Sequence, residues 1–154
     1  MDHRIIDLHV HSTESDGTLT PEDLVAEAKK AGLAAFALTD HDTCQGVCKA
    51  MPLAASAGIE LIPGIELSTN YHGKEVHIVG LYIDIENEQL LKKTAEYRKC
   101  RSERNALMVE ALQKEGLSIT MEELVAENPD CVITRANIAC FLYEHGKIKS
   151  VREA

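Results

Sequence analysis

The stretch Arg4–Asp16, which reads RIIDLHVHSTESD, decides how the rest of the chain is interpreted. It starts with the apolar pair Ile5-Ile6 and passes into polar residues, as a strand does when it enters a loop. Side chains two residues apart point to the same face of a strand, so His9 and His11 are expected to point the same way, with Asp7 on that face too. Two neighbouring imidazoles repel when both are protonated, and a shared divalent metal is the simplest reason for both to stay neutral. A His-x-His pair at a strand end can also be incidental, so the metal hypothesis depends on the residues that follow.

The composition is that of one ordinary domain. The chain has 154 residues, of which 45% are hydrophobic and only 4% aromatic, with no Trp, so aliphatic side chains must fill the core. The formal charge of −9 argues against electrostatic wrapping of a nucleic-acid polymer. A small phosphorylated substrate remains compatible with this charge, because bound cations can reverse the local field.

Other classes of protein are not indicated by the sequence. The start of the chain lacks the apolar segment of a signal peptide, and no run approaches the length of a membrane span, so a cytoplasmic protein is expected. The five cysteines are odd in number and irregularly spaced, which does not indicate a disulfide framework. Cys44 and Cys48 are one helical turn apart and could share a metal, or they are ordinary reduced thiols.

The first half of the sequence predicts an α/β fold with a mainly parallel sheet, because strands and helices alternate. Polar residues gather where the first three strands end, which is where such folds carry their active sites. The expected order is a strand from Ile5, a helix over 21–31, a strand over 34–38, a helix over 44–57, a strand over 59–62 that resumes over 65–68, and a strand over 75–83.

After Asp84 the composition becomes helical. Residues 87–116 contain no Pro and no internal Gly, which predicts one long helix or two abutting ones, and further helices are expected over 121–127 and 135–145. We therefore divide the chain into residues 1–84, with the polar motifs, and residues 85–154, a helical insertion or continuation.

The polar residues at the predicted strand ends form a candidate metal site. Histidine and carboxylate ligands together suit Zn, Mn or Fe, and six of them exceed one tetrahedral site, so more than one ion is expected. Each of these residues, taken alone, could instead have an ordinary structural role, as a carboxylate that orders a loop, as the partner of a lysine or as a histidine of the core. The hypothesis therefore rests on the convergence of all six: His9, His11, Asp16, His41, Glu66 and His77.

Four ordered motifs resemble the PHP (polymerase and histidinol phosphatase) domain family: DLHVHSTESDGTLTPEDLVAEAKKAGL, ALTDHDT, PGIELS and VHIVGL. The resemblance covers roughly residues 4–84 and is greatest to the small stand-alone phosphoesterases. It implies a distorted (β/α)₇ barrel, of which the first four strands are present, with up to three metals at the carboxyl ends of its strands. By that similarity the first metal is held by His9, His11 and Glu66, the second by Glu66 and His77, and the third by Asp16 and His41.

Two departures from the family pattern stand out. A family histidine that completes the second metal is replaced by Asn137 in the segment Thr134-Arg135-Ala136-Asn137, and an amide oxygen is a weaker ligand. The family's last two ligands, an Asp and a His, and the last strands of the barrel are not found in these 154 residues. Because four strands cannot close a barrel, we expect a longer protein, or an open edge covered by the helices or by a second copy of the chain.

The leading functional hypothesis is hydrolysis of a small phosphate monoester, such as a nucleotide, by a metal-bound hydroxide. Arg135 is a candidate for binding phosphate, or an ordinary surface arginine. Asp7, Asp40 and Asp42 are expected to orient the ligand imidazoles. Two alternatives are a metal-binding module that is catalytically incomplete, and an amide or lactone hydrolase with a similar metal centre.

Overall fold

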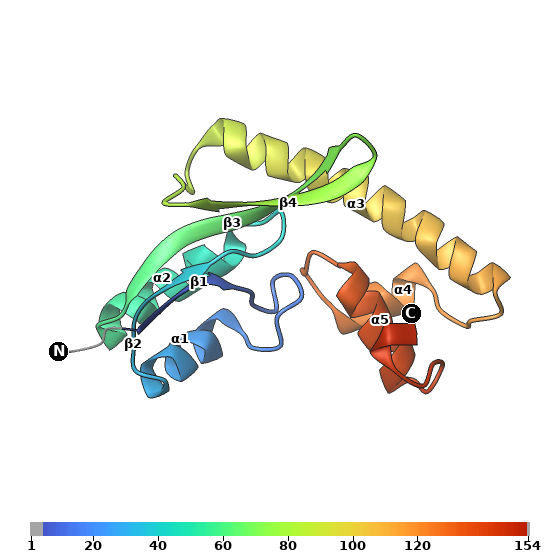
Figure 1. Cartoon of the computed structure of the whole chain (residues 1–154), viewed down its shortest axis with the longest axis horizontal. Helices are drawn as coiled ribbons and strands as arrows, with labels where there is room; N and C mark the ends of the chain where they lie inside the picture. Colours follow the sequence, from blue (N-terminus) through green and yellow to red (C-terminus); the bar gives the residue numbers. More distant parts are fainter. Residues whose placement is uncertain (1–4, 154) are drawn as a thin grey trace.

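The computed structural model describes residues 5–153, which form an α/β unit followed by helices (Figure 1). The predicted order of strands and helices is confirmed. The α/β unit contains β1 (Ile5–Val10), α1 (Pro21–Lys30), β2 (Leu33–Leu38), α2 (Gln45–Ala57), β3 (Glu60–Tyr71) and β4 (Lys74–Leu81). The helical part contains α3 (Glu88–Lys114), α4 (Met121–Glu127), α5 (Arg135–Glu144) and a short 3₁₀ helix, η1 (Val151–Glu153). Residues 87–116 therefore form one long helix rather than two.

The four strands form one sheet in the order β1-β2-β3-β4. β1 pairs with β2 and β2 with β3 in parallel, whereas β3 and β4 form an antiparallel hairpin. Within residues 5–153 both outer strands lack a second neighbour, and Ile5, Ile6 and Ile78 on them are 58%, 54% and 52% exposed. The sheet is thus an open half of a barrel, as the sequence predicted.

β3 is a continuous strand of 12 residues, although two shorter stretches were expected on either side of Pro63-Gly64. Pro63 has no backbone N–H to donate, and its carbonyl accepts the backbone N–H of Ile83 at 3.1 Å. A Cβ on Gly64 would lie 2.7 Å from Thr39 Cγ2 and 3.0 Å from the carbonyl oxygen of Leu38. A glycine is therefore required where β3 passes the carboxyl end of β2.

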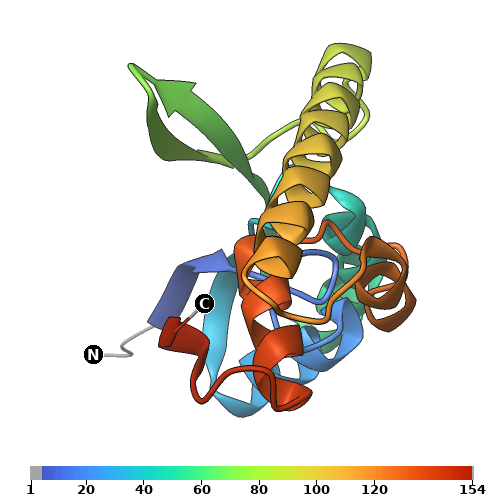
Figure 2. The same cartoon turned by 90° about the vertical axis from the view of Figure 1, so that its right-hand side faces the viewer.

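Two hydrophobic clusters stabilise the chain. The first packs α1 and α2 on one side of the sheet, with Phe36, Leu38 and Val47 almost fully buried (Figure 1). The second joins α3, α4 and α5 through residues that include Leu124 and Leu142. Figure 2 shows α3, in yellow to orange, extending from the hairpin side of the molecule to this second cluster. Within the described part of the chain, every helix is too short or too polar to cross a membrane.

Helix ends follow the sequence closely, because they depend on local hydrogen bonds. The hydroxyl of Thr20 accepts the backbone N–H of Asp23 at 3.1 Å and starts α1. Thr120 and Thr134 form capping boxes at the starts of α4 and α5. Gly58, at φ 73°, ends α2 in the left-handed conformation that glycine adopts most easily.

The second cluster gives a direct test of its packing. Leu142 is fully buried in it, whereas Leu107 on α3 is 66% exposed. We expect Leu142→Ala to lower the free energy of unfolding by about 2–5 kcal/mol, because it removes buried methyl groups and leaves a cavity. The matched control Leu107→Ala should change it by less than about 0.5 kcal/mol. Urea denaturation of both variants measures the difference, and equal values would contradict this packing.

Candidate metal centre

The six predicted ligands converge at the carboxyl end of the parallel strands. His9 and His11 lie at the end of β1, and Asp16 lies in the loop that follows. His41 follows β2, and its backbone forms an isolated parallel bridge with Glu66 on β3. His77 is delivered by β4, where it pairs in register with Ser68. Segments far apart in the sequence thus bring four imidazoles and two carboxylates to one place.

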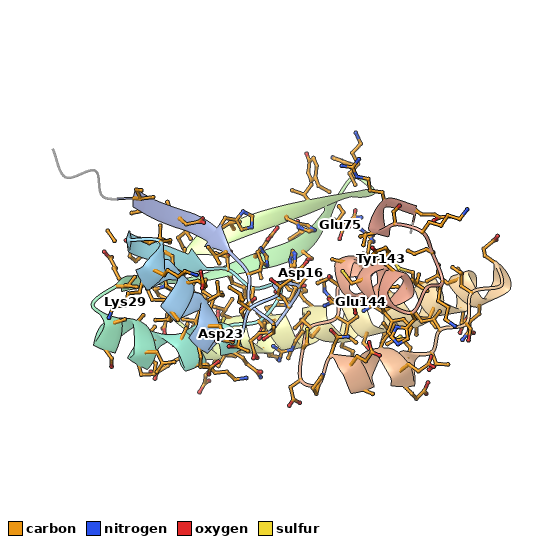
Figure 3. All side chains as sticks on the ribbon, turned by 90° about the horizontal axis from the view of Figure 1, so that it is seen from below. Asp16, Asp23, Lys29, Glu75, Tyr143 and Glu144 are labelled. Atoms are coloured by element: carbon orange, nitrogen blue, oxygen red, sulfur yellow. The ribbon has the colours of Figure 1, made fainter. Side chains whose placement is uncertain are left out.

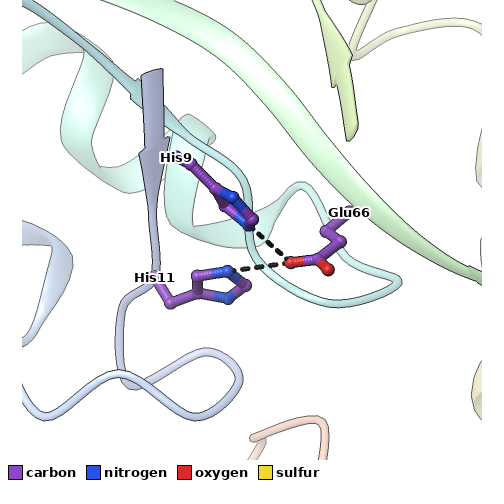
Figure 4. A group of neighbouring side chains, drawn as sticks. All are labelled: His9, His11 and Glu66. Carbon is purple, nitrogen blue, oxygen red and sulfur yellow. Dashed lines mark hydrogen bonds and ion pairs between the residues drawn. The ribbon is translucent and has the colours of Figure 1, made fainter. Parts of the chain in front are cut away.

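Glu66 lies at the centre of this arrangement, as Figure 4 shows for its contacts with His9 and His11. Its Oε2 atom is 2.8 Å from His9 Nε2 and 2.9 Å from His11 Nε2. Its Oε1 atom is 2.7 Å from His77 Nδ1. The carboxylate is 6% exposed, so these imidazoles are its main polar surroundings. One carboxylate with its two oxygens facing different histidines has the geometry needed to bridge two cations.

Asp16 joins two of the same histidines from the loop side. Its Oδ1 atom is 3.2 Å from His11 Nδ1, and its Oδ2 atom is 3.5 Å from His41 Nε2. The ring centroids of His11 and His41 are 4.8 Å apart. His11 therefore has one ring nitrogen toward Asp16 and the other toward Glu66.

Three groups of potential ligands result, each with its ligand atoms within 4.8 Å of one another. These groups contain the ligand sets implied by the family resemblance. In addition, His11 joins the group that contains Asp16, and His41 joins the group that contains His77. Ligand atoms about 2.1 Å from a common ion lie roughly 3–4 Å apart, so the spacing is of the right size. The groups are His9, His11 and Glu66; His11, Asp16 and His41; and His41, Glu66 and His77.

An orphaned nitrogen shows that the site suits metal ions. The Nδ1 atom of His41 is buried and has no hydrogen-bond partner among residues 5–153, and it lies 3.9 Å from Glu66 Oε2. A buried polar atom without a partner is costly, and coordination of a cation would satisfy it. The mixed nitrogen and oxygen donors are compatible with Mn, Zn or Fe. Binding of metal by these residues stays a prediction.

The charges of the site are strongly coupled. Burial works to lower the pKa of His11, but its hydrogen bond to Asp16 and the nearby carboxylates outweigh burial and raise it. Burial works to raise the pKa of Asp16, but hydrogen bonds from His11 and His41 lower it well below its usual range. Histidine contacts lower the pKa of Glu66 against burial in the same way. The carboxylates are therefore ionised at neutral pH and ready to bind cations.

A titration tests this coupling. In chelator-treated protein we expect His11 to titrate above its usual value of 6.5, because Asp16 and Glu66 stabilise the imidazolium. The stability from this pairing is complete below about pH 6.5 and is lost as the pH rises through the raised pKa. Metal must displace this proton, so metal affinity should fall as the pH falls. Histidine ¹⁵N NMR measures the pKa, and a value at or below 6.5 for His11 would contradict the arrangement.

Asp40 supports His11 through a serine. Its carboxylate is 1% exposed and accepts hydrogen bonds of 2.7 Å from the backbone N–H of Ser12, the hydroxyl of Ser12 and the hydroxyl of Ser15. Ser15 Oγ lies 3.3 Å from His11 Nδ1. A Cβ on Gly46 would lie 2.3 Å from Asp40 Oδ2, so α2 can approach this network only with a glycine there. Asp40 thus orders the loop that carries Asp16.

Asp7 and Asp42 contact other groups than the imidazoles for which they were proposed. Asp7 is exposed and accepts the backbone N–H of His9 at 3.2 Å, and a register shift between Asp7 and Val10 interrupts the regular alternation of β1. Asp42 is buried and binds Arg101 of α3 through hydrogen bonds of 3.1 Å from Nε and 2.7 Å from Nη2. Its Oδ1 also accepts the backbone N–H of Ser68 at 3.0 Å. Asp42 therefore holds the backbone beside His41 and Glu66 in place and does not orient an imidazole ring.

Two residues of α5 lie at the border of the site. Arg135 is exposed and forms an ion pair with Glu75, and Glu75 Oε1 lies 3.4 Å from His77 Nε2. Asn137 does not offer a free amide oxygen, because its Oδ1 accepts the backbone N–H and the hydroxyl of Thr134 in the capping box. Its Nδ2 donates to the carbonyl of Ser15 at 3.2 Å. Asn137 thus ties α5 to the loop of Asp16 instead of acting as the family histidine does.

The polar residues that α3 and β4 bring to this border were not predicted from the sequence: Arg101, Arg104 and Glu75. Figure 3 shows Asp16 and Glu75 at the junction between the α/β unit and the C-terminal helices. In the sequence, the basic residues of α3 look like an ordinary solvated helix face, so they carry no local signal of this position. Burial raises the pKa of the Cys44 thiol to about 11, which agrees with an ordinary reduced thiol at this position.

Comparison with known proteins agrees with this fold and site. The PHP domain family matches residues 7–130, and the chain belongs to this family. The 5'-3' exoribonuclease Rnm of Escherichia coli (strain K12) is 38% identical over 151 residues, 97% of this chain and 52% of that protein. The 3',5'-nucleoside bisphosphate phosphatase of Chromobacterium violaceum is 36% identical over 149 residues, 96% of this chain and 52% of that protein.

The structural comparison points to the same class. A crystal structure described as a putative metal-dependent phosphoesterase from Bifidobacterium adolescentis superposes with a TM-score of 0.88 at 32% sequence identity. The match covers 99% of this chain and 54% of that chain. The 154 residues thus span about half the length of the relatives they match, which agrees with the open sheet.

Proposed function

We propose that this chain carries the metal-binding half of a phosphoesterase that hydrolyses a small phosphate monoester, such as a nucleotide. One observation supports this above all: six side chains, from β1, β3, β4 and the segments that follow β1 and β2, form three overlapping groups that share His11, His41 and Glu66. The names of the relatives, which include a nucleoside bisphosphate phosphatase, agree with a phosphorylated substrate.

Each part of the site has a role in this proposal. Divalent cations, up to three per complete site, supply positive charge for the phosphate oxygens and lower the pKa of water. His9, His11, His41 and His77 would hold these cations as neutral imidazoles, and Glu66 and Asp16 would compensate their charge. Arg135, at the border of the site, binds phosphate through its planar fork, which matches two phosphate oxygens. The Asp40 network keeps Asp16 in place.

Phosphate release from a simple monoester such as AMP tests the proposal. We expect the chelator-treated chain to be inactive and manganese to restore turnover. His9→Ala should abolish this turnover, whereas the control His145→Ala should retain it, because His145 lies away from the site and pairs with Glu127 at 3.1 Å. Equal manganese-dependent turnover in wild type and His9→Ala would contradict the assignment.

The length of the relatives supports the rival hypothesis of an incomplete module. If the other half of the barrel contributes ligands, this half alone holds metal without turnover. One weakly bound metal per chain and no phosphate release would favour that reading, and several bound metals with turnover would exclude it.

A second substrate class is an RNA end, because curated relatives of 37–38% identity are named exoribonucleases. The charge of −9 argues against extensive contacts with a polymer, so only the terminal nucleotide would enter the site. Incubation with a short 5'-phosphorylated RNA separates the two candidates. Stepwise release of mononucleotides indicates the exonuclease, whereas release of phosphate alone indicates the phosphatase.

A further inference from the structure

The loop 12–17, which carries Asp16, is held from two sides. On one side, the Asp40 network binds the hydroxyls of two serines of this loop. On the other side lies the segment 131–137, which leads into α5 and includes its first turn, and which we call the loop clamp. Figure 1 shows the loop after β1, in blue, facing this segment, in orange. The helical part of the chain thus contacts the loop that supplies one of the candidate ligands.

Three donors of the loop clamp bind two successive carbonyls of the loop. The backbone N–H of Val132 donates to the carbonyl of Glu14 at 2.9 Å. The thiol of Cys131 donates to the carbonyl of Ser15 at 2.7 Å, and the Nδ2 atom of Asn137 donates to the same carbonyl at 3.2 Å. Glu14 and Ser15 are the two residues before the candidate ligand of the loop. The loop clamp therefore fixes the backbone from which that carboxylate extends.

Water cannot easily replace these hydrogen bonds. Ser15 is fully buried, and Val132 is buried as well. Burial raises the pKa of the Cys131 thiol to about 12, so the thiol stays protonated at neutral pH and can donate. A buried carbonyl that has lost a donor is unfavourable, and the backbone relieves this by moving toward water. We therefore expect the loss of a donor from the loop clamp to loosen the loop.

We propose that the loop clamp positions Asp16 for metal binding, with Cys131 as a positioning residue. Asp16 belongs to only one of the three ligand groups, the one that also contains His11 and His41. The other two groups contain no residue of the loop 12–17. A loosened loop should therefore weaken one metal site selectively, and the helical part of the chain is then a component of the metal centre. This inference rests on the proposed function, because it assumes that the ligand groups hold the cations of that reaction.

Manganese binding, followed through the electron paramagnetic resonance of the free ion, tests the loop clamp without any need for turnover. We expect Cys131→Ala to weaken the binding of one ion per chain about tenfold and to leave the other ions unchanged, because partners that orient a ligand typically contribute about 10–100-fold to affinity. Cys131→Ser restores a donor and should recover most of the lost affinity. Cys140→Ala is the matched control, since Cys140 is an exposed cysteine of α5 outside the loop clamp, and it should bind manganese as wild type does.

A double-mutant cycle separates positioning from simple packing. If Cys131 acts through Asp16, Cys131→Ala should have no effect on manganese binding in an Asp16→Asn background, whereas its effect on the free energy of unfolding should be the same in both backgrounds. Wild-type manganese binding in Cys131→Ala, or equal weakening in both backgrounds, would overturn the proposal. A wild-type chain that binds no manganese would overturn the loop clamp together with the metal centre. Manganese binding that depends on Cys131, in a chain that releases no phosphate from AMP, would support the loop clamp and count against the proposed function alone.

Discussion

Glu66→Gln is expected to cause the largest loss of metal binding of any single substitution in this chain. Glu66 belongs to two of the three ligand groups, and its oxygens lie 2.7–2.9 Å from nitrogens of His9, His11 and His77. The glutamine side chain has nearly the same shape as Glu66, but it has no negative charge and only one oxygen that could bind a metal. Removing a residue that only hydrogen-bonds to a metal ligand lowers metal affinity about 10–100-fold. Loss of this shared ligand itself should therefore lower metal affinity by more than about 100-fold.

Equilibrium dialysis against manganese, followed by elemental analysis, measures the metals bound per chain. Glu60→Gln is the matched control, because Glu60 lies on the same strand but is exposed and outside the ligand groups. We expect Glu60→Gln to bind metal as wild type does. If Glu66→Gln retains the wild-type metal content and affinity, Glu66 is not a shared ligand.

Arg101→Met is expected to cause the largest loss of stability among charged positions. Arg101 and Asp42 are 7% and 1% exposed, and the pair joins α3 to the end of β2. Removal of the arginine leaves the Asp42 carboxylate buried without its cation, which typically costs about 3–5 kcal/mol. Asp42 follows His41 directly and its backbone N–H donates to the carbonyl of Glu66 at 3.0 Å, so metal affinity should fall as well.

A double-mutant cycle separates this ion pair from simple loss of packing. Asp42→Asn removes the orphaned charge, keeps an acceptor for the backbone N–H of Ser68 and tolerates the positive φ of 54° at this position. The double variant Asp42→Asn/Arg101→Met should therefore be more stable than Arg101→Met alone. Arg98→Met controls for loss of a neighbouring arginine, and urea denaturation measures the wild type and all four variants. Equal stability of Arg98→Met and Arg101→Met would show that the pair is not important.

Features that depend on local sequence were predictable. The caps at Thr20 and Thr120, the glycine stop at Gly58 and the turn before β4 each depend on a few adjacent residues, so their signals are visible in the sequence itself. Convergence of His9, His11 and His41 with Glu66 was also predictable, because the carboxyl ends of parallel strands meet at one edge of a sheet. His77 joins them from the antiparallel strand β4.

Features that depend on tertiary contacts were not predictable. The register shift in β1 gives no local signal, and Asp7, which was expected to orient an imidazole, accepts the backbone N–H of His9 instead. The partner of Asp42 is Arg101, 59 residues later on a helix rich in other charged residues. Arg104 and Glu75 become significant only because α3 and β4 meet beside His77. Asn137 stands where the family has a histidine, and its position in α5 commits its oxygen to the cap of Thr134.

The most direct test of the account is anomalous X-ray diffraction from crystals grown with manganese, with data collected at the manganese absorption edge. We predict anomalous peaks within about 2.0–2.3 Å of the ligand atoms of His9, His11 and Glu66, and further peaks beside His41 and His77. Manganese bound elsewhere on the chain, with these side chains in the positions described and no peak between them, would contradict the central claim that they form a metal centre.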